Sequence, residues 1–142
     1  MILIPSLILA SFWGVQQHST DTLPGQLVTT VTTQGTFVMF DKQHPDRFFF
    51  RDASDQMEMD VVLTQPEADL FLADHAKDDL KITYQTRDVP KPGGGTERLY
   101  FETMLRSLRT GDNLKDWPQK LAADSSRLRR CQQELEDIRS VE

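Results

Sequence analysis

The sequence has a single cysteine and no excess of basic charge. The first feature excludes an internal disulfide bond, and the second argues against a nucleic-acid partner. Among its 142 residues the single cysteine, Cys131, has no partner for an internal disulfide bond, so the domain must be stable without one. The chain carries 16 Lys and Arg against 22 Asp and Glu, and the acidic excess lies between residues 21 and 112. Because nucleic-acid binding needs a basic face that neutralises phosphates, a nucleic-acid partner is not expected.

The sequence also lacks motifs for catalysis and for a bound cofactor. A hydrolytic nucleophile needs an activating base, but the histidines at positions 18, 44 and 75 fall in a linker, a turn and a helix, without a Ser or Cys motif. The glycine run 93–95 lacks the Lys and Ser/Thr that complete a phosphate-binding loop. We therefore predict no enzymatic activity, no catalytic residues and no cofactor.

Two groups of residues could suggest a metal site, but their spacing argues against it. The acidic residues of segment 52–60 lack the glycine and the terminal glutamate of an EF-hand loop, so they predict a solvated acidic hairpin. Met57 and Met59 could bind a soft metal, but they alternate with acids as the core residues of a strand do. No metal site is predicted.

The first twenty residues contain no charged side chain, and residues 1–15 form an apolar run. This run is shorter than the roughly 20 residues that span a bilayer, but it has the length of a signal-peptide core. We expect residues 1–20 to be a cleaved export signal, the mature chain to begin between about Val15 and Asp21, and the protein to be periplasmic or secreted. Because no basic residue precedes the run, two alternatives stay open: an N-terminal membrane anchor that tethers the chain through residues 1–15, or a buried N-terminal element.

Residues 21–112 have the pattern of a small β-barrel. A long strand is expected at 27–40, bent at Gly35, because a glycine inside a strand marks a bulge or a sharp bend. Short strands at 48–51 and 57–63 flank a turn at 53–56, and further strands are expected at 80–86 and 99–108. Between the third and fourth strands, the capping-box pattern at 64–67 predicts a helix of about three turns.

A turn centred on Ser54 and Asp55 fixes the register of the second and third strands. Antiparallel pairing then sets Arg51 opposite Glu58 and Phe50 opposite Met59, and the period of two assigns each side chain to a face. The face expected to be buried holds Phe48, Phe50, Met57, Met59 and Val61; the outer face holds Phe49, Arg51, Glu58 and Asp60.

Residues 113–142 are polar and favour a helix, expected from about Pro118 to Val141. Leu121, Leu128 and Leu135 recur at seven-residue spacing, with Cys131 on the same seam. Two outcomes are open. The seam packs on its own barrel, or two copies pair as a homodimer through residues 118–141 and bring their thiols close enough to bridge.

Five strands with a helix between the third and fourth are the order of an OB-fold, a Greek-key barrel. The predicted fold class is therefore mainly β with α: a small five-stranded OB-like barrel plus a C-terminal helix. The hairpin at 48–61, together with Gly35 and segment 79–83, also resembles the bacterial OB-fold (BOF) family of exported proteins, although Asp55 stands where that family usually has a turn glycine. The resemblance implies an exported, non-enzymatic binding domain whose natural ligand is poorly defined.

OB-folds bind ligands on the outer face of strands two and three and on the adjoining loops. The candidate binding residues lie on that face and on two flanking loops: Phe49, Arg51, Glu58, Asp60, Arg47, Arg87 and Lys91, with His44 and Arg98 beside them. The alternative interpretation is that this face binds no ligand and is simply solvated, with a cross-strand pair between Arg51 and Glu58. We expect an exported OB-fold binding module with an unknown small ligand or protein partner; the alternative is a structural or adaptor subunit of an envelope complex that docks through its C-terminal helix.

Overall fold

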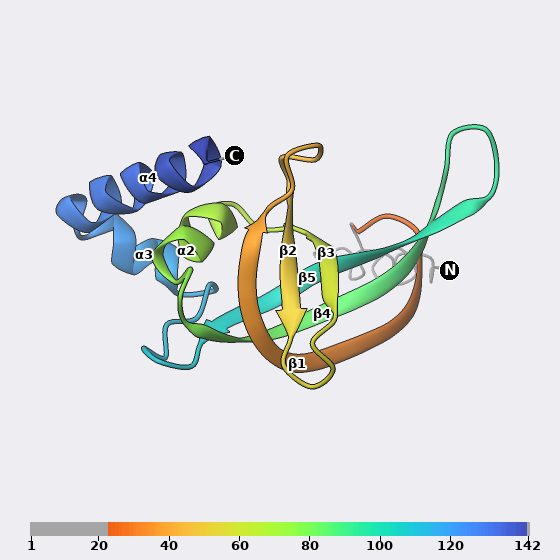
Figure 1. The fold of residues 1–142 in the computed structure, drawn as a ribbon, viewed down its shortest axis with the longest axis horizontal. Coiled ribbons are helices and arrows are strands. Elements are labelled where there is room, and N and C mark those ends of the chain that lie inside the picture. Colours follow the sequence, from red (N-terminus) through yellow and green to blue (C-terminus); the bar gives the residue numbers. More distant parts are fainter. Residues whose placement is uncertain (1–22, 142) are drawn as a thin grey trace, which may run out of the picture.

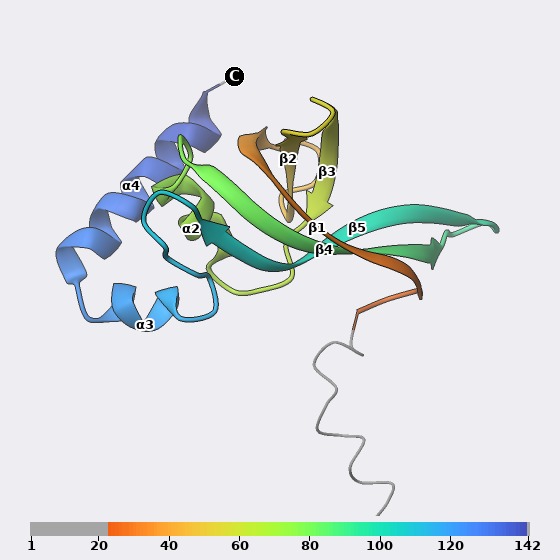
Figure 2. The same ribbon diagram turned by 90° about the horizontal axis from the view of Figure 1, so that it is seen from below.

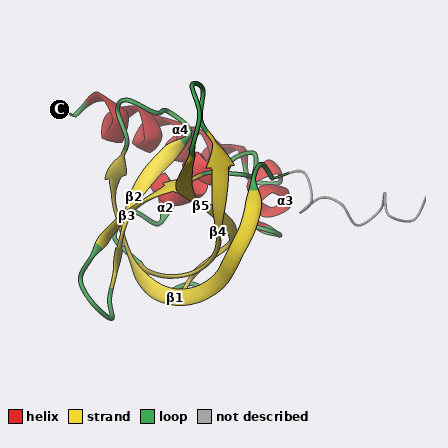
Figure 3. Ribbon diagram, turned by 90° about the vertical axis from the view of Figure 1, so that its right-hand side faces the viewer, coloured by secondary structure: helices red, strands yellow, loops and turns green. Residues whose placement is uncertain are grey.

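The computed structural model describes residues 23–141, and within them five strands close into a barrel in the order β1, β2, β3, β5, β4 (Figure 1). The expected export signal or anchor at residues 1–20 lies outside the described residues. Helices pack against one end of the barrel (Figure 3). This is the predicted OB-like barrel. Its elements are β1 (Gln26–Phe40), β2 (Arg47–Asp52), β3 (Glu58–Val62), α2 (Ala68–Asp74), β4 (Asp79–Pro90), β5 (Thr96–Ser107), α3 (Trp117–Ala122) and α4 (Ser125–Ser140).

Strand β1 is long because it pairs on both sides of the barrel. Its residues 26–36 pair with β4, and residues 35–40 pair with β2. Gly35 belongs to both ladders, opposite Asp52 in β2 and Leu80 in β4. The strand curves around the barrel (Figure 3), while its register shifts lie elsewhere, between Leu27 and Thr29 and between Phe37 and Met39. Gly35 therefore marks the change of partner strand.

The predicted register of the β2–β3 hairpin is confirmed at every pair: Arg51 with Glu58, Phe50 with Met59, and Phe49 with Asp60. Phe48, Phe50 and Val61 are buried, and Met59 packs against the core. Met57 was expected on the buried face, and this is wrong, because its side chain is 62% exposed. The ladder begins only at Glu58, so Met57 belongs to the turn and the alternation of the strand does not reach it.

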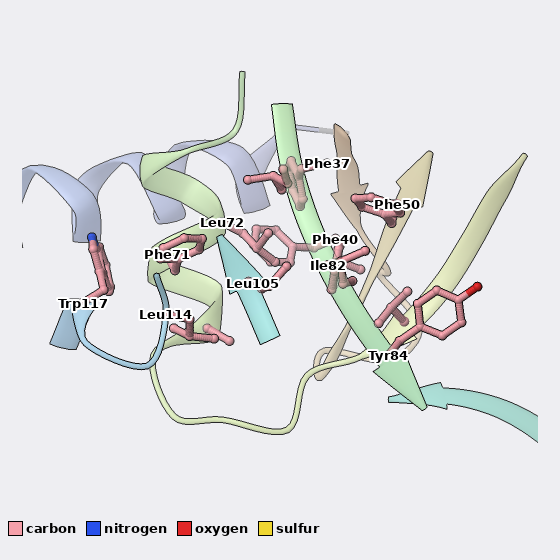
Figure 4. Close-up of a cluster of buried hydrophobic side chains, with 14 of the residues drawn as sticks. Phe37, Phe40, Phe50, Phe71, Leu72, Ile82, Tyr84, Leu105, Leu114 and Trp117 are labelled. Carbon is pink, nitrogen blue, oxygen red and sulfur yellow. The ribbon is translucent and has the colours of Figure 1, made fainter. Parts of the chain in front are cut away.

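The barrel interior and the helices share one continuous core (Figure 4). Inside the barrel, Phe37 packs edge-on against Phe40, with ring centroids 4.9 Å apart. At the helical end, Phe71 meets Trp117 edge-on at 5.4 Å. The helices therefore close one end of the barrel with apolar side chains.

Helix α2 begins later than the capping-box pattern predicts. The pattern places the N-cap at Thr64, but Glu67, with φ of 67°, precedes the helix and makes no side-chain cap. The backbone N–H of Thr64 donates instead to the side chain of Glu102 at 3.0 Å, and its hydroxyl donates to the backbone carbonyl of Glu102 at 2.7 Å. The helix therefore has seven residues where about three turns were expected, because Thr64 is bound to Glu102 of β5 and its side-chain oxygen does not accept from the first turn of α2.

Glu102 is fully buried in the barrel wall, and Gln65 Nε2 also donates to it at 3.1 Å. Burial raises the pKa of Glu102 to about 7, although the donors from Thr64 and Gln65 act in the opposite direction. In the unfolded chain the pKa of a glutamate is about 4.3. Between these two values the folded state holds more protons than the unfolded state, so ionisation of Glu102 lowers the free energy of unfolding as the pH rises.

We predict that Glu102→Gln removes this part of the pH dependence. Relative to the wild type, the variant is expected to gain stability between about pH 4.5 and 7, by an amount on the order of 3 kcal/mol, and the gain is expected to stay constant above that range. Urea unfolding across the pH range measures it, with Glu97→Gln, an exposed change on the same strand, as the control. A difference between variant and wild type that does not change with pH would contradict the prediction.

The C-terminal tail forms two helices where one was predicted. The break lies at Asp124, whose carboxylate caps α4 by accepting from the backbone N–H of Arg127 at 3.1 Å. Leu128, Leu135 and the fully buried Cys131 pack into the core of the same chain, and burial raises the pKa of the Cys131 thiol to about 12. Pairing of two tails through this seam would therefore require α4 to leave α2 and the core of its own chain.

Candidate functional site

A pocket of about 740 Å³ lies where the end of β1 and the following loop meet the last turn of α4. Its walls are mainly apolar, with charged side chains among them. This size falls within the range of small-molecule sites in proteins, which are concave and mostly apolar. The pocket is lined by Val38, Met39, Phe40, Asp41, Lys42, Pro45, Ile138, Arg139 and Val141.

The register shift of β1 and the docking of α4 together form this pocket. The shift between Phe37 and Met39 spans Val38, which lines the pocket, and the side chain of the next lining residue, Met39, is 41% exposed. From α4, the guanidinium of Arg139 lies over the ring of Phe40 at 4.7 Å and donates to the carbonyl of Pro45 at 3.3 Å. One side chain thus joins α4 to both β1 and the loop.

Next to the pocket, Asp41 and Asp60 form a pair of carboxyl groups. Burial of Asp60, with its hydrogen bond to Asp41, raises the pKa of Asp60 to about 6, and the same hydrogen bond lowers the pKa of Asp41 to about 2. Asp41 also accepts from the backbone of Gln43 at 2.9 Å and lies 3.1 Å from Nδ1 of His44. The pair therefore gains its second negative charge as the pH rises through about 6, and perturbed carboxyl groups of this kind gather at functional sites.

The outer face of β2 and β3 holds most of the residues predicted as binding residues, but they contact one another. Arg51 donates to Glu58 across the two strands, and Arg47 lies 3.9 Å from Asp60. Phe49 is half-buried between Met39 of β1 and Asp60 of β3. Here the structure brings Arg47, Phe49 and Asp60 close to the pocket, through the neighbouring residues Met39 and Asp41.

Arg87 and Lys91 lie elsewhere, on the β4–β5 hairpin, which projects beyond the barrel (Figures 1 and 2). The guanidinium of Arg87 donates to the carbonyls of Pro24 and Gly25 at 2.8 and 2.9 Å, so it ties down the start of β1. Lys91 begins the loop at the tip, and Arg98 pairs with Asp88 at 2.9 Å. These residues therefore do not share a site with the pocket.

The apolar walls of the pocket were not among the predicted binding residues. Met39 and Phe40 belong to a strand that reads as core, and Ile138 and Val141 lie far along the chain in a tail without tertiary context. A register shift cannot be read from alternation alone. The part of the pocket that could be predicted from the sequence is the loop 41–46, since loops of this kind bind ligands in OB-folds. Of this region, only His44 and its neighbour Arg47 were predicted as binding residues.

Comparison with protein-family models, with curated proteins and with solved structures finds no match to this chain. No helix within residues 23–141 is long and apolar enough to cross a membrane. The pocket and its neighbouring carboxyl pair are the structural features that point to a function.

Proposed function

We propose that this protein is an exported OB-fold binding module without catalytic activity, and that it holds a small, mainly apolar ligand in the pocket between β1, the loop 41–46 and α4. The observation that carries the proposal is the pocket itself, with its mainly apolar walls and about 740 Å³ of volume. The perturbed pair Asp41–Asp60 at its edge supports it. The loop is also one of those through which OB-folds bind ligands.

The exported location is supported by the uncharged apolar run at residues 1–15 and by the resemblance to the BOF family. The mass of the protein recovered from outside the cytoplasm tests it. We expect a mature chain that begins between about Val15 and Asp21. A chain that keeps Met1 and is found in the membrane fraction would show that residues 1–15 act as a membrane anchor and not as a cleaved signal.

The adaptor alternative would use a different surface. Since the apolar side of α4 packs on α2 and on the core of its own chain, a partner would have to dock on the outward side, where the exposed residues are polar, among them Arg129, Arg130 and Glu136. Such a surface fits a weak, salt-sensitive contact better than the stable core of a complex.

We predict that the pocket binds the apolar fluorophore 1-anilinonaphthalene-8-sulfonate and that Met39→Glu weakens this binding by about tenfold or more, because a carboxylate would then face the apolar wall. Val141→Glu, a change at a second lining residue that is 68% exposed, is expected to do the same. Fluorescence titration of the folded protein gives the affinities.

Met57→Glu is the matched control, because Met57 is also exposed but lies in the β2–β3 turn and does not line the pocket. Its affinity should equal that of the wild type. Equal weakening by all three changes, or a titration of the wild type that does not saturate, would show that the fluorophore does not bind in the pocket, and the proposal would fail.

A further inference from the structure

A second group of polar residues lies where the end of α2, the connection between β5 and α3, and the start of α4 meet. Asp74 ends α2 and His75 follows it, Asp112 lies in the connection between β5 and α3, and Arg127 belongs to the first turns of α4. Figures 1 and 2 show α2 between the barrel and α4, with α3 at the end of this layer. These residues come from parts of the chain that the fold alone brings together.

The imidazole of His75 is held in one orientation. Its side chain is 1% exposed, its ring lies 4.5 Å from that of Phe71, and Nδ1 is 2.8 Å from a carboxylate oxygen of Asp78. Asp78 in turn accepts from Ser107 at 3.0 Å and from Arg109 at 2.6 Å. A carboxylate with these donors is an acceptor, so Nδ1 carries the proton that it shares with Asp78, and the lone pair of the neutral ring lies on Nε2.

Nε2 of His75 is buried and has no hydrogen-bond partner among residues 23–141. The polar atoms that face it are oxygens of two carboxylates: Oδ2 of Asp112 at 3.3 Å and Oδ2 of Asp74 at 3.6 Å. A lone pair opposite two carboxylate oxygens is repulsive unless a cation lies between them. The arrangement therefore calls for either a second proton on the ring or a metal ion.

The spacing of the three atoms fits a metal ion. Zinc binds His nitrogen and carboxylate oxygen at about 2.0 to 2.2 Å, so two ligand atoms at a tetrahedral angle lie about 3.3 to 3.5 Å apart. The two distances from Nε2 match this spacing closely, and the three donor atoms all lie within 4.8 Å of one another. The bond from His75 to Asp78 is also the second contact that metal-binding histidines usually make.

Among residues 23–141, two cations compete with a metal ion for these carboxylates. Lys120 Nζ lies 3.4 Å from Oδ1 of Asp112, the oxygen that does not face His75. Arg127 lies beside both carboxylates. Its Nη2 donates to Oδ2 of Asp74 at 2.8 Å and to Oδ2 of Asp112 at 3.1 Å. A carboxylate oxygen has two lone pairs, so each can accept from Arg127 and still bind a metal. Because Arg127 reaches only the oxygens, it does not give Nε2 of His75 a partner.

We propose that Asp74, His75 and Asp112 form a site for a divalent transition-metal ion, with zinc the best match, and that the ion links the end of α2 to the connection before α3. Imidazole with carboxylates is a donor set that suits zinc, and a fourth ligand would complete the tetrahedron. Since Arg127 of α4 contacts both carboxylates, the ion would also fix the surface on which α4 docks.

The test is a titration of the full chain, first freed of metal with a chelator. Zn²⁺ is expected to bind with one equivalent in calorimetry and to raise the melting temperature, because it binds the folded state. Co²⁺ is expected to give the intense visible absorption of a four-coordinate ion. His75→Gln and Asp112→Asn should each weaken binding at least about tenfold, and Asp78→Asn about 10- to 100-fold through the orientation of the ring.

His44→Gln is the control, since His44 belongs to a different His–carboxylate group with Asp41 and Asp60, and its change should leave the affinity unaltered. The wild type supplies a measurement that needs no variant: Zn²⁺ should shift the ¹⁵N resonance of His75 Nε2. Failure of the wild type to bind one equivalent, an equal loss in His44→Gln, or an unmoved Nε2 resonance would overturn the proposal and leave the group around His75 with a structural role only.

Discussion

Phe50→Ala is expected to lower the free energy of unfolding by about 3 to 5 kcal/mol, while Phe49→Ala, the next residue on the same strand, costs much less. Phe50 is fully buried and meets Phe48 edge-on inside the barrel, so truncation leaves a cavity among residues that cannot all collapse into it. Phe49 points to the outer face, where it is only half-buried. Urea unfolding of the two variants, compared at the same pH, measures the contrast.

The two variants differ only in the face that each side chain occupies, so they control for strand propensity and for the loss of an aromatic ring. Equal losses would mean that the outer face of β2 and β3 is as well packed as the interior. In that case the residues predicted there as binding residues would be structural. The side of the pocket that adjoins them would then be covered and closed to a ligand.

Local patterns predicted the barrel because its elements obey them. The period of two in β2 and β3, with one turn between them, fixes the partner of Phe50 without knowledge of the rest of the fold. The order of strands around one short helix leads to the OB-like barrel, which closes as expected. Both inferences rely on residues that are close in sequence.

The first error comes from a distant residue that competes with a local pattern, and the other two come from local features that the pattern does not contain. Thr64 has the sequence context of a helix cap, but it donates to Glu102, a buried carboxylate on β5. The seven-residue spacing of leucines predicts one helix, but Asp124 caps a second one and so divides the tail. Met57 fits the alternation of buried and exposed residues in β3, but it lies in the turn before the strand begins and is therefore exposed.

The pocket and the polar group around His75 could not be predicted, because distant parts of the chain form each of them. The pocket needs α4 against the end of β1, and the group around His75 needs Asp112 from beyond β5. In the sequence, His75 reads as a single helical histidine beside acids. What singles it out is the nitrogen without a partner, and that is a property of the packed structure.

Gly35→Ala is expected to lower the free energy of unfolding by about 3 kcal/mol or more, because no space exists for a side chain where β1 changes partner. A Cβ at Gly35 would lie 2.0 Å from the carbonyl oxygen of Arg51 and 2.6 Å from the ring of Phe50. The backbone of Arg51 cannot move aside without opening the β1–β2 ladder. Thermal or urea unfolding measures the loss.

Gly93→Ala separates this crowding from the general cost of replacing a glycine. Gly93 has φ of 90°, which disfavours alanine, but nothing lies within 4 Å of the added Cβ, so a loss of only about 1 to 2 kcal/mol is expected. The double variant Gly35→Ala with Phe50→Ala distinguishes the two contacts. Removing the ring relieves one of them, but the carbonyl of Arg51 remains, so most of the cost of Gly35→Ala should persist in the Phe50→Ala background. If that cost disappears instead, the clash with the ring of Phe50 is the only reason that position 35 requires glycine. The strands β1 and β2 can then separate enough to make room for a methyl group.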